Sequence, residues 1–281
     1  MPIIIKELSH IYDNDTPFYK TAITHINLEI KDHLTTAIIG ETGSGKSTLV
    51  QHLNALLKPT KGSVIVDEFT INSDEKKQKL KDLRKKVGLV FQFPEYQLFE
   101  ETIIKDVMFG PLNFKVSKVE ALENAKKALE LVGIDETYYE KSPLDLSGGQ
   151  KRRIAIAGIL AMNPDIIVLD EPTAGLDPQG AKEIMELFKS LNKTTIIVTH
   201  DMDHVLNYAD EVILLKDGSL MYHDKVKNFF NNHQIWNDLN IEKPMIIKTK
   251  ELLIKKGFNI NESSMDLKSI VRDIKKQVTN D

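Results

Sequence analysis

Cysteine is absent from the 281 residues of this chain, and long apolar runs are absent too. The lack of cysteine excludes disulfides and thiolate metal sites, and it fits a reducing compartment. No apolar run approaches the roughly 18–20 residues that cross a bilayer, and the charges of Lys6 and Glu7 come too early for a signal peptide. The formal net charge of −4 gives no basic field for nucleic acid. We therefore expect a soluble protein that meets any membrane through a partner.

The length allows one large core, or one core with a small appendage. Short β-branched apolar runs alternate with helical stretches along most of the chain. Such runs are typical of buried strands in a mostly parallel sheet, and the alternation predicts an α/β fold. The predicted strands are Thr35–Ile39, Val64–Val66, Val87–Phe91, Ile166–Leu169, Thr194–Val198 and Val212–Leu215, and predicted helices include Lys118–Val132 and Gly180–Leu191.

The composition of the chain changes near residue 228. Asparagine and lysine become frequent, strand-like runs stop, and short amphipathic pieces remain at Thr249–Lys256 and Leu267–Lys276. We therefore predict a catalytic domain over residues 1–227 and a small, mainly helical extension over residues 228–281.

A basic run at Lys76–Lys86 contains seven basic residues and one acidic residue. We interpret it as a solvated face or loop, because charge runs are usually hydrated. A nucleic-acid patch is the alternative interpretation, although no aromatic side chains are interleaved with the run to stack on bases.

The segment from Gly40 to Ser47 matches the pattern G-x-x-x-x-G-K-[ST]. Its glycines allow a tight turn whose backbone N–H groups, with the N-terminus of the following helix, surround a β-phosphate. Lys46 would place its charge on the β- and γ-phosphates, and the Ser47 hydroxyl would bind Mg²⁺. The predicted nucleotide-binding loop consists of Gly40, Glu41, Thr42, Gly43, Ser44, Gly45, Lys46, Ser47 and Thr48.

Two adjacent carboxylates, Asp170 and Glu171, follow the apolar run Ile166–Leu169. A buried strand would deliver them to the end of the sheet, where ligands of such folds bind. Asp170 would hold Mg²⁺ through water, and Glu171 would accept a proton from the attacking water. A strand that simply ends in a helix-capping aspartate is the alternative, and the phosphate loop upstream argues against it.

A second potential anion site lies at Leu146-Ser147-Gly148-Gly149-Gln150. Ser147 would cap a helix that begins at Lys151, and the two glycines would expose backbone N–H groups at its positive end. The phosphate loop alone fits kinases, GTPases and other nucleotide binders. With this signature added, the sequence resembles the ABC ATPase family over about residues 3–225. In that family the signature closes over the nucleotide of a partner subunit, which gives this role to Ser147, Gly148, Gly149 and Gln150.

The resemblance gives roles to three further residues. Gln92 matches the Q-loop glutamine, which binds Mg²⁺ and water and senses the membrane partner. Asp177 ends the stretch Ala174–Asp177, which matches the D-loop at the dimer interface. His200 follows a predicted strand and matches the switch histidine that contacts the γ-phosphate.

An aromatic residue near the N-terminus is expected to stack on adenine. Tyr12 matches the family position, and Phe18 or Tyr19 could take the role instead. The resemblance further implies hydrolysis of ATP with Mg²⁺, because no catalytic motif departs from the family pattern. The implied catalytic residues are Lys46, Gln92, Glu171 and His200, and the implied Mg²⁺ ligands are Ser47, Gln92 and Asp170. The implied fold is a mostly parallel core sheet with an antiparallel β subdomain and a helical signature subdomain.

Finer features resemble the energy-coupling factor (ECF) importers of vitamins and metals. The stretch Phe91–Thr102, followed by Phe109-Gly110-Pro111, resembles their Q-loop region. Thr16-Pro17-Phe18 and Pro244-Met245 resemble their second, or A-prime, ATPase. The resemblance implies a heterodimer with a similar ATPase, a transmembrane coupling protein and a substrate-binding membrane protein, at the cytoplasmic face of the cell membrane. The C-terminal extension would contact the other ATPase, and no nucleic-acid partner is expected.

Other ABC proteins fit less well. Repair proteins insert a long coiled coil between phosphate loop and signature, and the segment between Lys46 and Ser147 has no heptad array. Translation factors carry two cassettes in one chain, and exporters often fuse membrane spans. The ATPase of another importer, for metal ions or amino acids, stays an alternative, as does an ABC clamp that acts on nucleic acid.

Overall fold

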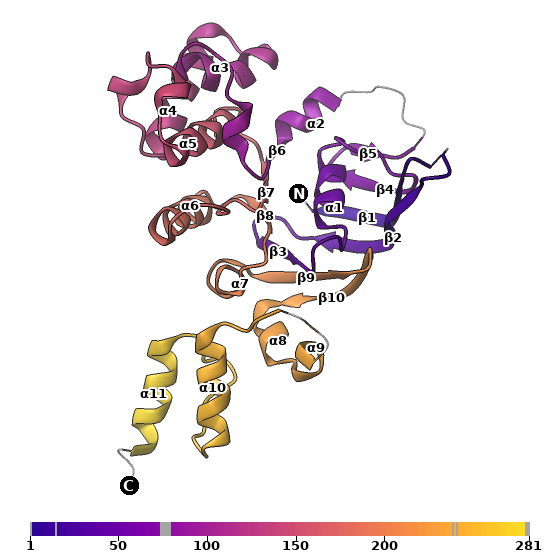
Figure 1. Ribbon diagram of the computed structural model, residues 1–281, viewed down its shortest axis with the longest axis vertical. Helices are drawn as coiled ribbons and strands as arrows, with labels where there is room; N and C mark the ends of the chain where they lie inside the picture. Colours follow the sequence, from indigo (N-terminus) through magenta and orange to yellow (C-terminus); the bar gives the residue numbers. More distant parts are fainter. Residues whose placement is uncertain (1, 15, 74–79, 238, 240, 279–281) are drawn as a thin grey trace.

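The computed structural model describes residues 2–14, 16–73, 80–237, 239 and 241–278, and Figure 1 labels its elements. The strands are β1 (Ile3–Tyr12), β2 (Lys20–Ile30), β3 (Thr35–Ile39), β4 (Lys61–Val66), β5 (Phe69–Ile71), β6 (Val87–Val90), β7 (Ile166–Asp170), β8 (Thr194–Val198), β9 (Glu211–Lys216) and β10 (Ser219–Lys225). The helices are α1 (Lys46–Leu53), α2 (Leu80–Lys86), α3 (Ile103–Asn113), α4 (Lys118–Leu131), α5 (Gly148–Leu160), α6 (Pro178–Ser190), α7 (Met202–Tyr208), α8 (Val226–Asn231), α9 (His233–Asn237), α10 (Met245–Lys255) and α11 (Leu267–Val278). Short 3-10 helices are η1 (Pro94–Gln97), η2 (Glu136–Tyr138) and η3 (Pro143–Asp145).

A six-stranded sheet in the order β10-β9-β3-β8-β7-β6 forms the centre of the catalytic part. Its strands pair in parallel except β10, which runs antiparallel along the edge. The parallel strands are buried along nearly their whole length, as expected for a sheet covered on both faces. Parallel pairing places the carboxyl ends of β3, β7 and β8 at one edge. The loops that follow these strands therefore meet there.

The second sheet is antiparallel, in the order β2-β1-β4-β5. The prediction that Val64–Val66 belongs to the parallel sheet is wrong, because β4 pairs antiparallel with β1 and β5. Only Asp67 and Glu68 separate β4 from β5, and Asp67 has a φ of 54°. A two-residue turn of this kind makes a hairpin, whereas a parallel neighbour requires a longer crossover.

A helical subdomain built from α3, α4 and α5 lies to one side of the sheets (Figure 1). The predicted helix Lys118–Val132 is α4, and Gly133 follows it with a φ of 72°. Ala121, Ala125 and Leu129 of α4 are fully buried in a cluster with Ile154 of α5. The same cluster includes Ile167 of β7 and Ile197 of β8, so this subdomain shares an apolar core with one face of the parallel sheet.

The C-terminal part begins with α8 and α9 and continues into α10 and α11, which run side by side away from the sheet (Figure 1). The predicted amphipathic helices correspond to α10 and α11. Phe229, Phe230 and Trp236 pack in one cluster with Ile39 and Leu214 of the parallel sheet. The start of the extension thus shares a core with the catalytic part, and the domain boundary at residue 228 stays a prediction.

The basic run lies partly outside the described residues, since positions 74–79 are not among them. Its remainder is α2. Lys86 pairs with Asp67 and, at 2.9 Å, with Glu68. Within the described ranges, no helix combines the length and the apolar character needed to cross a membrane.

Candidate functional site

Glycines shape the loop between β3 and α1. Gly40, Gly43 and Gly45 have φ values of 146°, 84° and 97°, in the region that favours glycine. A Cβ atom on Gly40 would lie 2.2 Å from the carbonyl oxygen of Leu215, and one on Gly45 would lie 2.6 Å from Ile23. Side chains at these two positions would therefore clash as well as strain the backbone. α1 begins directly after Gly45, which places a positive helix end beside the loop.

Lys46 lies across this loop. Its Nζ donates to the carbonyl oxygens of Gly40 and Glu41, both at 2.8 Å. Burial lowers the pKa of Lys46, and the nearby charges of Glu171 and Asp170 act in the opposite direction. The lysine is thus a half-buried cation placed close to two carboxylates, as a phosphate-binding residue would be.

Asp170 is the last residue of β7 and is 8% exposed. The Ser47 hydroxyl donates a hydrogen bond to its carboxylate. Burial raises the pKa of Asp170, whereas the Ser47 hydrogen bond and the Lys46 charge lower it. The Ser47 hydroxyl, the Asp170 carboxylate and the Gln92 amide all line the same cavity and can each offer an oxygen atom to a metal ion. This donor set fits Mg²⁺, which takes one or two protein ligands and keeps several waters.

Glu171 and His200 face each other at the ends of neighbouring strands. The Glu171 carboxylate lies 2.9 Å from Nδ1 of His200, and the side chains are 15% and 78% exposed. The Glu171 N–H donates to the Val198 carbonyl oxygen at 3.0 Å, which fixes the backbone of β7 beside that of β8. The pair therefore joins a mostly buried carboxylate to an exposed imidazole that a ligand could reach.

These side chains line one cavity of about 470 Å³. The predicted residues that line it are Tyr12, Thr42, Gly43, Gly45, Lys46, Ser47, Thr48, Gln92, Asp170, Glu171 and His200. Gly40, Glu41 and Ser44 belong to the loop but not to this lining. Sequence reasoning missed Lys20, Ala22 and Val198, which also line the cavity. No motif marks these three positions, and their only signal is their place in strands that border the loop.

Of the three aromatic candidates for adenine stacking, only Tyr12 lines the cavity. Its hydroxyl lies 3.1 Å from Oγ1 of Thr48. Phe18 and Tyr19 are 85% and 64% exposed in the segment that joins β1 to β2. The geometry therefore favours Tyr12.

The signature residues lie at the start of α5, in the helical subdomain, and none of them lines this cavity. Ser147 caps α5 as predicted, and the side-chain oxygen of Gln150 accepts a hydrogen bond from the Ser147 N–H, which completes a capping box. The helix begins at Gly148, however, and not at Lys151. The reason is that both glycines adopt helical backbone within the cap. Asp177 does not line the cavity either; it is exposed, and it caps α6 by accepting from the Gly180 N–H at 2.7 Å.

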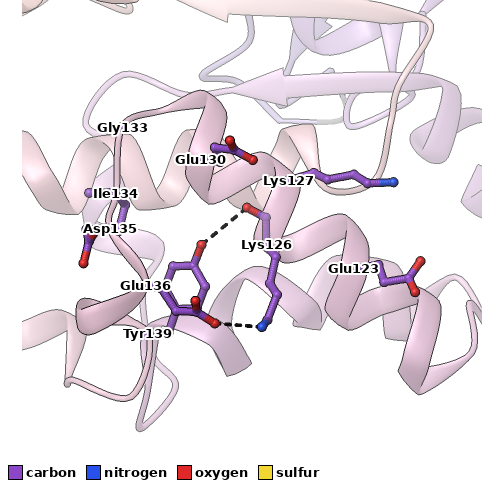
Figure 2. A pocket seen from close by; sticks show the side chains of 9 residues that line it. All are labelled: Glu123, Lys126, Lys127, Glu130, Gly133, Ile134, Asp135, Glu136 and Tyr139. Carbon is purple, nitrogen blue, oxygen red and sulfur yellow. Dashed lines mark hydrogen bonds and ion pairs between the residues drawn. The ribbon is translucent and has the colours of Figure 1, made fainter.

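A larger hollow of about 660 Å³ lies on the helical subdomain, between α4 and the segment around η2 (Figure 2). Two of its charged residues pair with each other, Lys126 with Glu136 at 2.8 Å, and the Tyr139 hydroxyl donates to the Lys126 carbonyl oxygen at 3.5 Å. None of the motif residues line it. The candidate site is therefore the cavity at the phosphate loop.

Comparison with protein families and curated proteins agrees with this geometry. The family model described as ABC transporter matches residues 23–174. The energy-coupling factor transporter ATP-binding protein EcfA2 of Enterococcus faecalis is 52% identical, over 93% of this chain and 92% of its own. The protein of the same name from Clostridium perfringens is 50% identical, over 93% of both chains.

Solved structures are similar across most of the chain. The structure of cbiO1 from Clostridium perfringens, described as part of the ABC transporter complex cbiONQ, matches with a TM-score of 0.72 and 39% identity. It covers 89% of this chain and 98% of its own. The ATP-binding cassette MJ0796, in a dimeric post-hydrolysis state bound to ADP and Pi, matches with a TM-score of 0.71 and 35% identity, over 80% of this chain and 98% of its own.

Fold, phosphate loop and family match together define an ATPase of the ABC type. The curated relatives that match more than nine-tenths of this chain at 50–52% identity are ATP-binding proteins of ECF transporters, which defines the class more narrowly. The chain belongs to the ABC transporter family, as one of the ATP-binding proteins of ECF transporters. The resemblance drawn from the motifs is thereby confirmed.

Proposed function

We propose that this chain, with Mg²⁺, hydrolyses ATP as one of two paired ATPases that drive uptake of a vitamin or another micronutrient. The observation that carries this proposal is the convergence of Lys46, Asp170 and Glu171 on one cavity, with His200 bonded to Glu171 at 2.9 Å. The proposed second ATPase is similar but not identical. A transmembrane coupling protein and a substrate-binding membrane protein complete the assembly at the cytoplasmic face of the membrane.

In the proposed reaction, the loop amides and Lys46 hold the β- and γ-phosphates of ATP. Glu171 takes a proton from the attacking water, and its contact with His200 holds the carboxylate in one orientation. His200 and Lys46 then stabilise the negative charge that builds up on the transferred phosphoryl group. Ser47, Asp170 and Gln92 would hold Mg²⁺, whose charge neutralises the phosphate oxygens.

The exposed signature supports the pairing of two ATPases. Ser147 and Gly148 are solvent-exposed and lie outside the cavity of their own chain. We propose that they close over ATP held by the partner ATPase, while the partner's signature closes over Lys46. ATP would then favour the closed pair, because it contacts both halves only when they are together. The helices of the C-terminal extension would add a further contact between the two.

A groove beside the segment that follows Gln92 supports the coupling to a membrane protein. It has a volume of about 580 Å³ and is lined by the segment after η1, by α3 and by α5. Phe99 and Phe109 line it and meet edge to face at 4.8 Å, with exposed fractions of 61% and 43%. Exposed aromatic side chains in a groove are typical of a protein–protein contact. We propose that helices of the coupling protein bind here and follow the opening and closing of the ATPase pair.

Replacing Glu171 with glutamine tests the proposed base. The substitution keeps the size of the side chain but removes the proton acceptor. We therefore expect ATP binding to persist and turnover to fall by about 10²–10⁴-fold. Turnover is measured as phosphate release by the assembled complex, and binding is measured by titration with ATP.

Glu186→Gln is the matched control, because Glu186 is an exposed glutamate on α6 that pairs only loosely with Lys182, at 3.7 Å. We expect this variant to hydrolyse ATP at the parent rate. Parent-rate hydrolysis by Glu171→Gln in the same complex would mean that Glu171 is not the base.

A further inference from the structure

Two buried histidines lie directly behind Tyr12. His52 of α1 is fully buried, and His10 of β1 is 8% exposed. Nε2 of His52 lies 3.2 Å from Nδ1 of His10, and the two rings meet at 74° with centroids 4.8 Å apart. Neither residue belongs to a nucleotide-binding motif. Burying two polar rings costs free energy unless they are hydrogen-bonded, so the role of this pair is inferred from the groups that it contacts.

The partners of the two rings determine where their protons are. Nδ1 of His52 lies 2.7 Å from the carbonyl oxygen of Thr48, and a carbonyl only accepts, so this nitrogen carries the proton. In the neutral ring Nε2 of His52 is then an acceptor. Nδ1 of His10 lies 3.0 Å from the Lys58 carbonyl oxygen and therefore also carries a proton. That proton is shared between Lys58 and Nε2 of His52.

The neutral form of His52 is also the one that the surroundings favour. Burial lowers the pKa of His52 to about 4 and outweighs the carbonyl oxygens of Thr48 and Lys58, while His10 acts in the same direction as burial. At neutral pH both rings are thus held by a single consistent pattern of donors and acceptors.

Two contacts connect the histidine pair to Tyr12. The ring of His10 meets that of Tyr12 edge to face, with centroids 4.6 Å apart and an angle of 78°. The Tyr12 hydroxyl bonds Oγ1 of Thr48 at 3.1 Å, and the carbonyl of the same Thr48 accepts from His52. Thr48 and the two histidines therefore form a closed connection between the phosphate-loop helix and the aromatic ring at the cavity.

We propose that His10 and His52 are positioning residues that set the orientation of Tyr12 for stacking on the adenine base. This inference rests on the proposed function as an ATPase, and it takes Tyr12, the aromatic candidate that lines the cavity, as the residue that stacks on adenine. An aromatic ring gains from stacking only when its face is correctly presented. A bracing pair behind Tyr12 fixes that presentation before ATP binds, which lowers the cost of ordering the ring on binding. Among the described residues, the only phosphate-loop residue that the pair contacts by a hydrogen bond is Thr48, through its backbone carbonyl oxygen, which cannot donate to a phosphate.

The test compares two probes on the full-length chain with Mg²⁺: ATP, and inorganic tripolyphosphate, which has the phosphates without the base. His52→Leu keeps a buried side chain of similar volume but removes both hydrogen bonds. We expect it to weaken ATP binding about five-fold and to leave tripolyphosphate binding within about two-fold. His52→Gln, whose amide oxygen can accept from His10, should restore most of the lost ATP affinity.

Leu53→Ala is the matched control, since Leu53 is the next residue of α1 and is also fully buried. A purely structural role for His52 predicts that both variants weaken the two probes alike, and that result would overturn the proposal. Tyr12→Leu distinguishes the positioning role of the two histidines from the adenine-stacking role of Tyr12. If Tyr12→Leu leaves the ratio of the two affinities unchanged, the adenine role of Tyr12 is wrong. If Tyr12→Leu changes the ratio but His52→Leu does not, only the bracing role is wrong.

Discussion

His52 is a buried group whose charge depends strongly on folding. Its pKa is lowered from 6.5 to about 4, mainly by burial. The unfolded chain therefore binds this proton between pH 6.5 and 4, while the folded chain does not. The contribution of His52 to the unfolding free energy is fully present above pH 6.5 and is lost as the pH falls toward 4. The reason is that proton binding in this range stabilises the unfolded chain and not the folded one.

We expect the native chain to lose about 2 kcal/mol of unfolding free energy through His52 alone between pH 7.5 and 5. The measurement is urea unfolding of the native chain and of His52→Gln at both pH values, since the difference between the two chains isolates this residue. Equal pH dependence in both chains would contradict the prediction. Imidazole nitrogen shifts in NMR spectra provide an independent value of the pKa.

At the residue scale, the sequence predicted the groups that carry a motif and missed those that do not. Lys46, Asp170 and Glu171 were predicted because charge and spacing mark them, and they line one cavity. His10 and His52 carry no such mark. Their contact depends on a strand and a helix that meet only in the fold, and a lone histidine in a sequence gives no sign of its partner.

At the scale of elements, one arginine connects three segments that the proposed coupling uses. Arg152 of α5 is 3% exposed, and its Nε and Nη2 donate to the two carboxylate oxygens of Glu95 in η1, at 3.1 and 3.0 Å. It also donates to the carbonyl oxygen of Ala174, in the loop between β7 and α6. The signature helix, the segment after Gln92 and the loop after Glu171 are thus tied to one side chain.

Arg152→Lys retains the charge but cannot form the two-pronged contact, so we expect it to cost about 2 kcal/mol of unfolding free energy. Because the linked segments include the proposed membrane-facing groove, ATPase activity stimulated by the membrane partners should fall more than ATP affinity. Arg153→Lys is the control on the same helix, since Arg153 is 29% exposed and pairs with Glu183 at the surface. Equal effects of the two substitutions would contradict a special role for Arg152.

The elements were predicted best where the pattern is simple. Thr35–Ile39 and Thr194–Val198 are strands with the predicted bounds, because fully buried parallel strands are uninterrupted apolar runs. β1 and β2 were not predicted from their residues. Their pairing has register shifts between Ile5 and Leu8 and again beyond His10, which interrupt the alternation that marks an antiparallel strand.

At the scale of the whole molecule, the two proposed halves of an ATP site lie on different parts of one chain. The phosphate loop opens on its cavity at the edge of the parallel sheet, and Ser147 is exposed on the helical subdomain. The order of the motifs predicted both surfaces. It could not predict the residues of the partner's surface or the cargo, because the motifs specify residues of this chain alone.

This separation predicts which subunit loses ATP when each surface is changed. Ser147→Arg places a bulky charge at the signature, so the partner's ATP should lose its second contact, while ATP on this chain's own loop is retained. Lys46→Ala should do the reverse. Photolabelling of the assembled pair with azido-ATP measures the two subunits separately. We expect label on the partner to fall about ten-fold in Ser147→Arg, as for loss of one contact to a charged group. Loss of label from this chain instead would mean that its signature serves its own site.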